Sequence, residues 1–308
     1  ELDALPFPAW DLLNHKLYAK KPSMAAIGFR PYITVVTSRG CPYKCAYCHR
    51  TMGKVFRKRS ANSVLAEMEE LRFKHGFKEF EIIDDCFNLD RERMRTILTG
   101  IQNRLGDIKL HFVNGLRADI LNPDDIALFK KAGTVSAFFA IETTSVRLQT
   151  MIHKNLNIER ATSTINAAVK AGIYSTGLFM LGFPTETYDE AWATVDFAIR
   201  SPLHRAFFFS PIPFPGTELE KMATEFLKNK NRIINPQETV YFPPSSVLNI
   251  SAMSDTELQK IFRLAYRRFY LNPKRILRLV TRHPNILSLP WYAFITLIKL
   301  MPGKRRVS

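Results

Sequence analysis

The chain has 308 residues, of which 46% are hydrophobic and 23% are charged. This composition excludes a disordered tail, a collagen-like fibre and a disulfide-stapled mini-protein, and the length suits one α/β barrel or two smaller domains. The net charge is +16, and +10 of it lies in residues 251–308. The basic character therefore belongs mainly to the C-terminal end.

The start of the chain and its cysteine content indicate a reducing compartment. Residues 1–6 lack the basic start and the apolar run of a signal peptide. Four cysteines are too few for a disulfide scaffold. No run of about 18 apolar residues could span a membrane. We expect a cytoplasmic protein, and the missing initial Met suggests a piece of a longer one.

Strands and helices are expected to alternate along the middle of the chain. Runs of β-branched and aromatic residues predict buried strands at 32–37, 79–84, 109–114, 135–141, 174–181 and 205–210. The helices between them are expected to begin at the capping residues Ser60, Asp90, Asn122, Asn157 and Thr187. Parallel neighbours need a crossover, so this order predicts an α/β fold with a parallel sheet, either a partial barrel or an open doubly wound sheet.

The two ends of the chain depart from this rhythm. Residues 1–30 are expected to form a proline-containing lead-in, and residues 31–216 the barrel. Residues 217–308 are expected to form a helical, basic C-terminal extension, in which Ser254 and Glu257 cap a helix with one apolar face. No G-x-G-x-x-G follows the first strand, which argues against a dinucleotide-binding sheet.

Three cysteines cluster directly after the first strand. Cys41, Cys45 and Cys48 are close enough in sequence for their thiolates to reach one metal centre from one tight loop. Three protein ligands on a four-iron cluster would leave one iron open to an exogenous ligand. Zinc with His49 as a fourth ligand is an alternative, although adjacent Cys48 and His49 would bind a tetrahedral ion under strain.

The Cys-x3-Cys-x2-Cys spacing, with Tyr47 before the third cysteine, resembles the radical S-adenosylmethionine (SAM) enzymes. The resemblance implies a partial (β/α)6 parallel barrel, a [4Fe-4S] cluster on Cys41, Cys45 and Cys48, and SAM chelated to the open iron. Reductive cleavage of SAM to a 5′-deoxyadenosyl radical would then activate a C–H bond of the substrate. A flavodoxin- or ferredoxin-type electron donor is the expected partner.

Further segments resemble the cobalamin-linked subgroup, which includes anaerobic magnesium-protoporphyrin ester cyclases and C-methyltransferases. These segments are 53–60, 84–87, 115–119, 141–143, 177–184 and 213–217. The resemblance implies methylation or oxidative cyclisation of a small-molecule or lipid-like substrate, with cobalamin as a further cofactor. Members of this subgroup usually carry a cobalamin domain before the barrel. No D-x-H-x-x-G cobalamin motif appears in these residues, and the start without Met fits such an upstream domain. A cobalamin-free radical enzyme is the alternative.

Charged residues, glycines and prolines collect where the predicted strands end, which is the edge that carries active sites in βα barrels. The resemblance implies SAM contacts at Tyr47, Asp84, Asp85, Glu142, Gly182 and Pro184. Glu142 would meet the ribose or the amino group of SAM, and Tyr47 and the Gly182–Pro184 turn would meet the adenine. Asp84 and Asp85 would orient the methionine amino group, although they depart from the usual Gly-Gly-Glu of the family.

Two further residues and the basic C-terminus leave alternatives open. Cys86 is a substrate-side thiol, an auxiliary ligand or a small buried residue, and His111 is expected to be a core histidine. The C-terminal cations suit an anionic membrane, a nucleic acid or a solvated face. No nucleic-acid-binding module accompanies them, which argues against the second. Membrane contact would use Trp291, Tyr292, Phe294 and Leu297. Outside catalysis, a zinc-stabilised basic binding module is the alternative.

Overall fold

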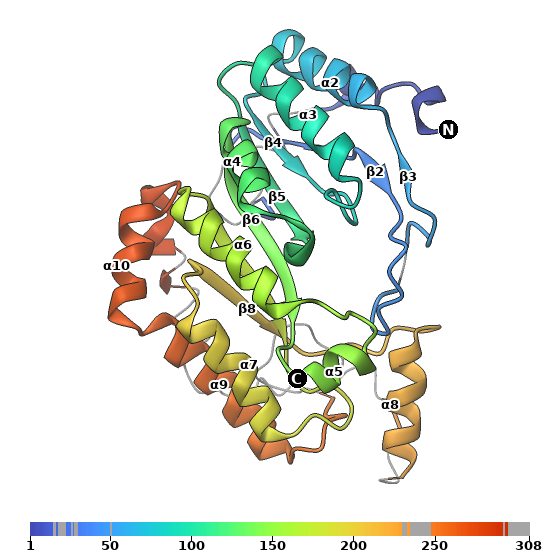
Figure 1. Ribbon diagram of the computed structural model, residues 1–308, viewed down its shortest axis with the longest axis vertical. Coiled ribbons are helices and arrows are strands. Elements are labelled where there is room, and N and C mark those ends of the chain that lie inside the picture. Colours follow the sequence, from blue (N-terminus) through green and yellow to red (C-terminus); the bar gives the residue numbers. More distant parts are fainter. Residues whose placement is uncertain are drawn as a thin grey trace.

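Six parallel strands form one curved sheet in the order β1-β4-β5-β6-β7-β8 (Figure 1). The computed structural model describes residues 1–14, 17, 23–25, 27, 30–49, 51–229, 233–234, 248–291 and 293–294. The strands are β1 Ile33–Val35, β4 Glu79–Ile82, β5 Lys109–Leu116, β6 Thr134–Glu142, β7 Tyr174–Met180 and β8 Arg205–Phe209. The six predicted strands are confirmed. All the strands are parallel, so their carboxyl ends lie at one edge of the sheet.

The helices between successive strands follow one another along the same side of this sheet, as crossovers of one hand require (Figure 1). They are α2 Ala61–Glu69, α3 Arg91–Arg104, α4 Pro123–Lys131, α6 Ile158–Lys170 and α7 Tyr188–Arg200. At each predicted start the capping side chain accepts a backbone N–H three residues on. These caps satisfy amides that the helix leaves unpaired, which is why the helix starts were readable from the sequence.

Several shorter elements were not predicted. They are the antiparallel pair β2 Ser38–Arg39 and β3 Arg57–Lys58, the helices α5 Val146–Met151 and α8 Glu218–Lys228, a π-helical turn at Glu70–Lys74, and 3-10 turns at Leu2–Ala4, Trp10–Leu12, Ala118–Ile120 and Ile286–Ser288. Helix α8 buries Leu219, Ala223 and Leu227, an apolar face with helical spacing that the sequence carries plainly. Strands β2 and β3 could not be predicted, because two residues are too few to show an alternation of apolar and polar side chains, and so short a pair is stabilised only by tertiary contacts.

The core lies between the sheet and its helices. Four phenylalanine side chains in this core are each no more than 2% exposed: Phe80, Phe112 and Phe139 from the strands and Phe129 from α4. His111 on β5 is also fully buried, and its Nδ1 lies 2.8 Å from Ser136 Oγ. His111 is therefore a core histidine, as predicted.

Helix α9, Asp255–Tyr270, takes the place of a further strand beside β8, the edge strand of the sheet. The Tyr266 hydroxyl lies 3.3 Å from both the N and the O of Phe208. The Tyr270 hydroxyl lies 3.2 Å from the N and 2.9 Å from the O of Ala206. Each hydroxyl accepts from the amide and donates to the carbonyl of one residue, so two tyrosines pair the polar groups that face outward from this edge.

Part of the C-terminal positive charge is used inside the fold. Helix α10, Pro273–Arg282, buries Arg275, whose guanidinium donates to carbonyls at the end of α7. The accepting residues are Ala198, Ile199, Ser201 and Leu203. A cation at a helix C-terminus pairs the last carbonyls and opposes the negative end of the helix dipole.

Candidate cofactor site

The three cysteines lie on the loop between β2 and β3, and backbone hydrogen bonds fix this loop along its length. Cys41 N donates to Gly53 O at 3.2 Å. Ala46 is held on both sides, because its N donates to Ile152 O at 2.9 Å and its O accepts from Leu219 N at 2.9 Å. The unpredicted helices α5 and α8 thus serve the loop, since Ile152 directly follows the one and Leu219 lies in the first turn of the other.

Asp84 and Asp85 hold the chain where it enters this loop. Asp84 is 4% exposed and accepts from Thr37 N and Ser38 Oγ, both at 2.6 Å. Burial raises the pKa of this carboxyl. Asp85 accepts from Gly40 N at 2.8 Å. Gly40 has φ +83°, and a Cβ there would lie 2.3 Å from the backbone oxygen of Val55, which precedes β3. Only glycine therefore fits at this position.

A cavity of about 320 Å³ lies between the cysteine loop and the carboxyl edge of the sheet. Cys41, Cys45 and Cys48 line one part of it. The facing wall comes from the ends of β4, β5 and β6 and includes Asp85, Cys86, Asn114, Arg117 and Glu142. The structure therefore brings the three cysteines together with Tyr47, Asp85 and Glu142 of the expected contacts, which also line this cavity, and uses Asp84 to anchor the loop.

Glu142 is the most constrained residue of the wall. It has φ +67°, a left-handed conformation unusual for a side chain of this kind, and is 5% exposed. Its Oε1 accepts from the Tyr47 hydroxyl at 3.0 Å and from Lys154 Nζ at 3.3 Å. Lys154 is 8% exposed and also lines the cavity. Lys154 was not predicted, because a single lysine after a short helix stands in no sequence pattern.

The three thiols have different environments. A hydrogen bond from the Cys86 thiol lowers the pKa of the Cys41 thiol to about 6, although burial opposes this shift. Burial raises the pKa of Cys45, while Cys48 is exposed. Cys86 is 4% exposed and is placed against a cysteine of the loop. It is a buried strand-end residue and a cavity-lining thiol at once.

The donor set fits an iron–sulfur cluster. Within the described part of the chain, no three His, Cys, Asp or Glu side chains come close enough to bind a single metal ion. A cluster instead spreads its ligands, with one thiolate on each of several irons, and three thiols around one cavity supply that arrangement. His49, which a zinc site would need as a ligand, has its Nδ1 2.6 Å from Thr51 Oγ1 and its ring against Phe214.

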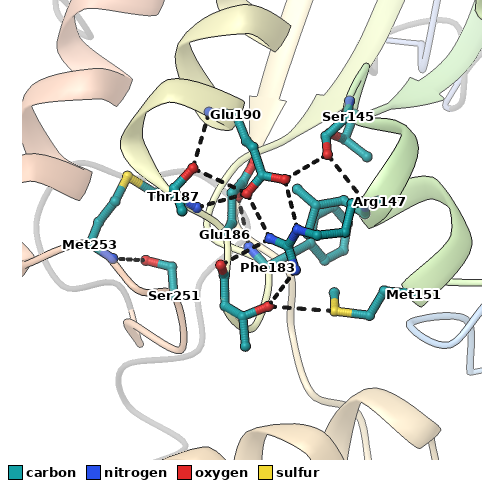
Figure 2. Close-up of polar contacts among 12 residues, drawn as sticks. Ser145, Arg147, Met151, Phe183, Glu186, Thr187, Glu190, Ser251 and Met253 are labelled. Atoms are coloured by element: carbon teal, nitrogen blue, oxygen red, sulfur yellow. Dashed lines mark hydrogen bonds and ion pairs between the residues drawn. The ribbon is translucent and has the colours of Figure 1, made fainter.

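Gly182 and Pro184 are not among the residues that line the cavity. A buried carboxyl organises the turn that they form. Glu186 is fully buried and accepts from the backbone N–H groups of Gly182 and Phe183 (Figure 2). Gly182 has φ +102°. The Phe183 ring lies 6.1 Å from the Tyr47 ring, centre to centre. The turn is thus linked to the cysteine loop through two aromatic rings.

An ion pair clamps the segment that follows this turn. Arg147 donates to Glu190 through Nε at 2.9 Å and Nη2 at 2.6 Å, and to Thr185 O at 3.0 Å (Figure 2). Ser145 Oγ donates to the same carboxylate at 2.7 Å. Helix α5 therefore holds the turn from one side. Thr187, which was expected to cap α7, forms its capping box with Glu190, whereas no sequence pattern pointed to Arg147 or Glu186.

Comparisons with known proteins show what the chain resembles. The chain is 30% identical over 284 residues to an uncharacterized methyltransferase of Pyrococcus horikoshii, an alignment that covers 92% of this chain and 59% of that protein. It is 24% identical over 271 residues to the anaerobic magnesium-protoporphyrin IX monomethyl ester cyclase of Cereibacter sphaeroides, covering 86% and 42%. The chain therefore spans only about half the length of these curated relatives.

The fold is shared with a solved enzyme, the radical SAM methyltransferase TsrM from Kitasatospora setae with tryptophan substrate and a SAM analogue bound. The TM-score is 0.61 at 18% sequence identity, covering 96% of this chain and 56% of that one. The model of the radical SAM superfamily matches residues 35–198, from β1 to the end of α7. This match covers more than half of the sequence, and the chain belongs to the radical SAM superfamily.

Proposed function

We propose that the chain is the catalytic barrel of a radical SAM enzyme, with a [4Fe-4S] cluster on Cys41, Cys45 and Cys48. When bound, the cluster supplies the electron that cleaves SAM reductively for C–H activation. One observation carries the proposal: the three thiols line the same cavity as the strand-end residues Glu142 and Asp85. A catalytic centre of a βα barrel is expected at this edge of the sheet.

The residues around the cavity have separate tasks in this proposal. Glu142 and Lys154 present one buried carboxylate and one buried ammonium, which suit the amino and carboxylate groups of SAM or the ribose hydroxyls. Tyr47 and the Gly182–Pro184 turn receive the adenine. Asp84 and Asp85 act by fixing the entrance of the cysteine loop, and Asp85 also reaches the cavity.

The reaction proposed is methylation or oxidative cyclisation of a small-molecule or lipid-like substrate with cobalamin. The methyltransferase and cyclase relatives support this choice. The cobalamin would come from a domain outside residues 1–308, and an electron donor of the flavodoxin or ferredoxin type would reduce the cluster. A radical enzyme without cobalamin is the second candidate, and the sequence upstream of Glu1 decides between the two.

Anaerobic reconstitution with iron and sulfide tests the cluster. We expect about four irons per chain in the parent protein and a loss of iron in Cys45→Ser and Cys48→Ser. Cys86→Ser is the matched control, because this thiol is buried beside Cys41 but lies outside the motif. Equal loss of iron in Cys86→Ser and Cys48→Ser would contradict the assignment. The reduced, loaded protein should also convert SAM to 5′-deoxyadenosine, and Cys45→Ser should not.

The C-terminal helices support a proposal of peripheral contact with an anionic membrane. Apolar side chains stand exposed on and after α10, among them Leu277 at 66%, Leu287 at 92% and Trp291 at 54%. Lys274 and Arg282 are exposed on the same helix. Exposed apolar groups next to cations suit a lipid interface. Tyr292, Leu297 and the basic residues 304–306 lie outside the described residues.

Flotation with liposomes tests this contact. None of the described helices is long and apolar enough to cross a bilayer. Binding to vesicles with anionic lipid should fall on deletion of residues 284–308 and in Leu277→Asn/Leu287→Asn. Val146→Asn is the control, because Val146 is 78% exposed on a different part of the molecule. Unchanged binding of the deletion variant would reject membrane contact.

A further inference from the structure

A second hollow, of about 760 Å³, also borders the cysteine loop. We call it the cationic groove, and we define it by Lys44, Lys54 and Lys221 together with Cys45 and Cys48. Lys221 comes from α8, which the Ala46–Leu219 hydrogen bond fastens to the loop. Cys45 and Cys48 line both the groove and the cavity described above. The two hollows therefore meet at these thiols, and a molecule in the groove would lie next to two of the three cysteines.

The groove carries unbalanced positive charge. Lys44, Lys54 and Lys221 are all exposed, and none forms an ion pair with another residue of the described chain. The acidic side chain among the lining residues, Glu218, has its Oε1 3.1 Å from His153 Nε2. Cys48 is itself exposed. A partner that enters the groove thus meets three lysines and comes directly against a cluster ligand.

These lysines suit a protein surface better than a small anion. A site for a small anion holds its ligand with buried, convergent donors, whereas the cations of this groove are long side chains exposed on its rim. Exposed charges of one sign act mainly by steering a partner of opposite charge and setting its orientation. An acidic protein that carries an electron matches both the charge and the position of the groove.

We infer that the cationic groove is the docking surface for an acidic electron-carrier protein of the flavodoxin or ferredoxin class. This inference rests on the proposed function, since it assumes a cluster on the three cysteines. The carrier is oxidised by one electron, the cluster is reduced by one electron, and no bond of this chain is made or broken. The electron enters at Cys48, the exposed cysteine of the three, which lines both hollows.

Stopped-flow reduction of the cluster-loaded chain by reduced flavodoxin tests the inference. At low ionic strength the second-order rate constant should fall about tenfold or more in Lys44→Glu/Lys54→Glu/Lys221→Glu, because steering of this kind changes association rates by roughly 10- to 1,000-fold. The salt dependence of the rate should flatten in the same variant. Reduction by reduced methyl viologen, a small cation, should be no slower than in the parent protein.

The matched control reverses three lysines at the opposite edge of the sheet. Lys78, Lys131 and Lys170 are exposed and precede strands or end helices, far along the chain from the cysteine loop. Lys78→Glu/Lys131→Glu/Lys170→Glu has the same net charge as the groove variant, and it should keep the parental rate with flavodoxin. Equal slowing in both variants would mean that net charge alone acts, and would overturn the inference.

Binding to the cluster-free chain separates the two proposals. Labelled oxidised flavodoxin should bind the parent and the control variant, by fluorescence anisotropy, and bind the groove variant at least about tenfold more weakly. Failure to take up iron would contradict the proposed function and leave this binding result to judge the groove. Normal iron uptake with equal flavodoxin binding in all three proteins would overturn the docking surface alone. Saturable binding of inorganic pyrophosphate in the groove at constant ionic strength would also overturn it, because the groove would then be a small-anion site.

Discussion

At the scale of single residues, Glu186 is completely buried, yet one of its two carboxyl oxygens has no hydrogen-bond partner among the described residues. The other oxygen accepts two backbone amides. Burial raises the pKa of this carboxyl to about 8. The group is therefore protonated at neutral pH in the folded protein and ionised in the unfolded chain.

This difference predicts a pH dependence of stability. Between pH 4.5 and about 8 the unfolded chain has lost the proton that folded Glu186 retains, so the free energy of unfolding falls as pH rises, by about 1.4 kcal/mol per pH unit. Glu186→Gln should remove this contribution. Urea unfolding of the cluster-free parent and variant at several pH values between about 6.5 and 8 measures it, and the difference between the two proteins cancels other groups such as Cys41. Parallel pH profiles would contradict the prediction.

The Glu142–Lys154 pair makes a second prediction. Glu142→Gln leaves a buried ammonium without its counter-charge and should lower the free energy of unfolding by about 3 kcal/mol. Glu142→Gln/Lys154→Met should recover most of that loss, because both charges are gone. SAM binding to the loaded protein, by equilibrium dialysis, should stay weak in both variants. Restored SAM binding in the double variant would show that the pair serves the fold alone.

The sequence revealed the residues that lie in motifs and missed those that act through distant partners. Tyr47 and Glu142 were predicted from motifs, and the structure places both on the cavity. Lys154 and Glu186 stand in no pattern of their own, and their importance comes from burial against groups that the chain brings from elsewhere. Burial of a single charged residue depends on tertiary packing, which local sequence does not encode.

At the scale of elements, Arg275 ties α10 to the end of α7. Arg275→Met keeps much of the side-chain volume but removes the guanidinium donor from the carbonyls of Ile199, Ser201 and Leu203. We expect a loss of about 2 to 4 kcal/mol in the free energy of unfolding, measured by urea titration. Lys274→Met is the control, because this neighbour is exposed and should change stability by less than about 0.5 kcal/mol.

The helices were predictable where a capping residue is followed by apolar side chains at helical spacing. Asn122 and Thr187 each open a helix with a full capping box, and both were readable from the sequence. Helix α5 is only six residues long and is fixed by its contacts with the cysteine loop and the turn after β7. Its N-cap, Ser145, is present in the sequence, but six residues are too few to show a helical period of apolar side chains, and a helix of that length has no stability of its own.

At the scale of the whole molecule, the net charge of +16 divides among different tasks. Arg275 caps a helix inside the fold, Lys154 is paired in the cavity, and the lysines of the cationic groove remain unpaired. The sequence located the excess near the C-terminus but could not separate these tasks. The separation depends on which side chains the fold buries.

The tyrosines of α9 make a prediction for the whole molecule. Tyr266→Phe/Tyr270→Phe keeps both rings but leaves the outward amides and carbonyls of Ala206 and Phe208 unpaired. An unpaired strand edge is a template for pairing with another chain. The double variant should therefore self-associate on mild heating, seen by light scattering, while the parent stays dispersed. A Tyr188→Phe variant, which leaves that edge intact, is the control.

Two hydroxyl groups spaced one helical turn apart thus decide where this sheet ends. The spacing of these side chains on the helix matches the two-residue repeat of the strand, because Tyr266 and Tyr270 meet alternate residues of β8. The protein gains a boundary that cannot be extended by copying the strand. In this way an incomplete barrel avoids self-association through this open edge.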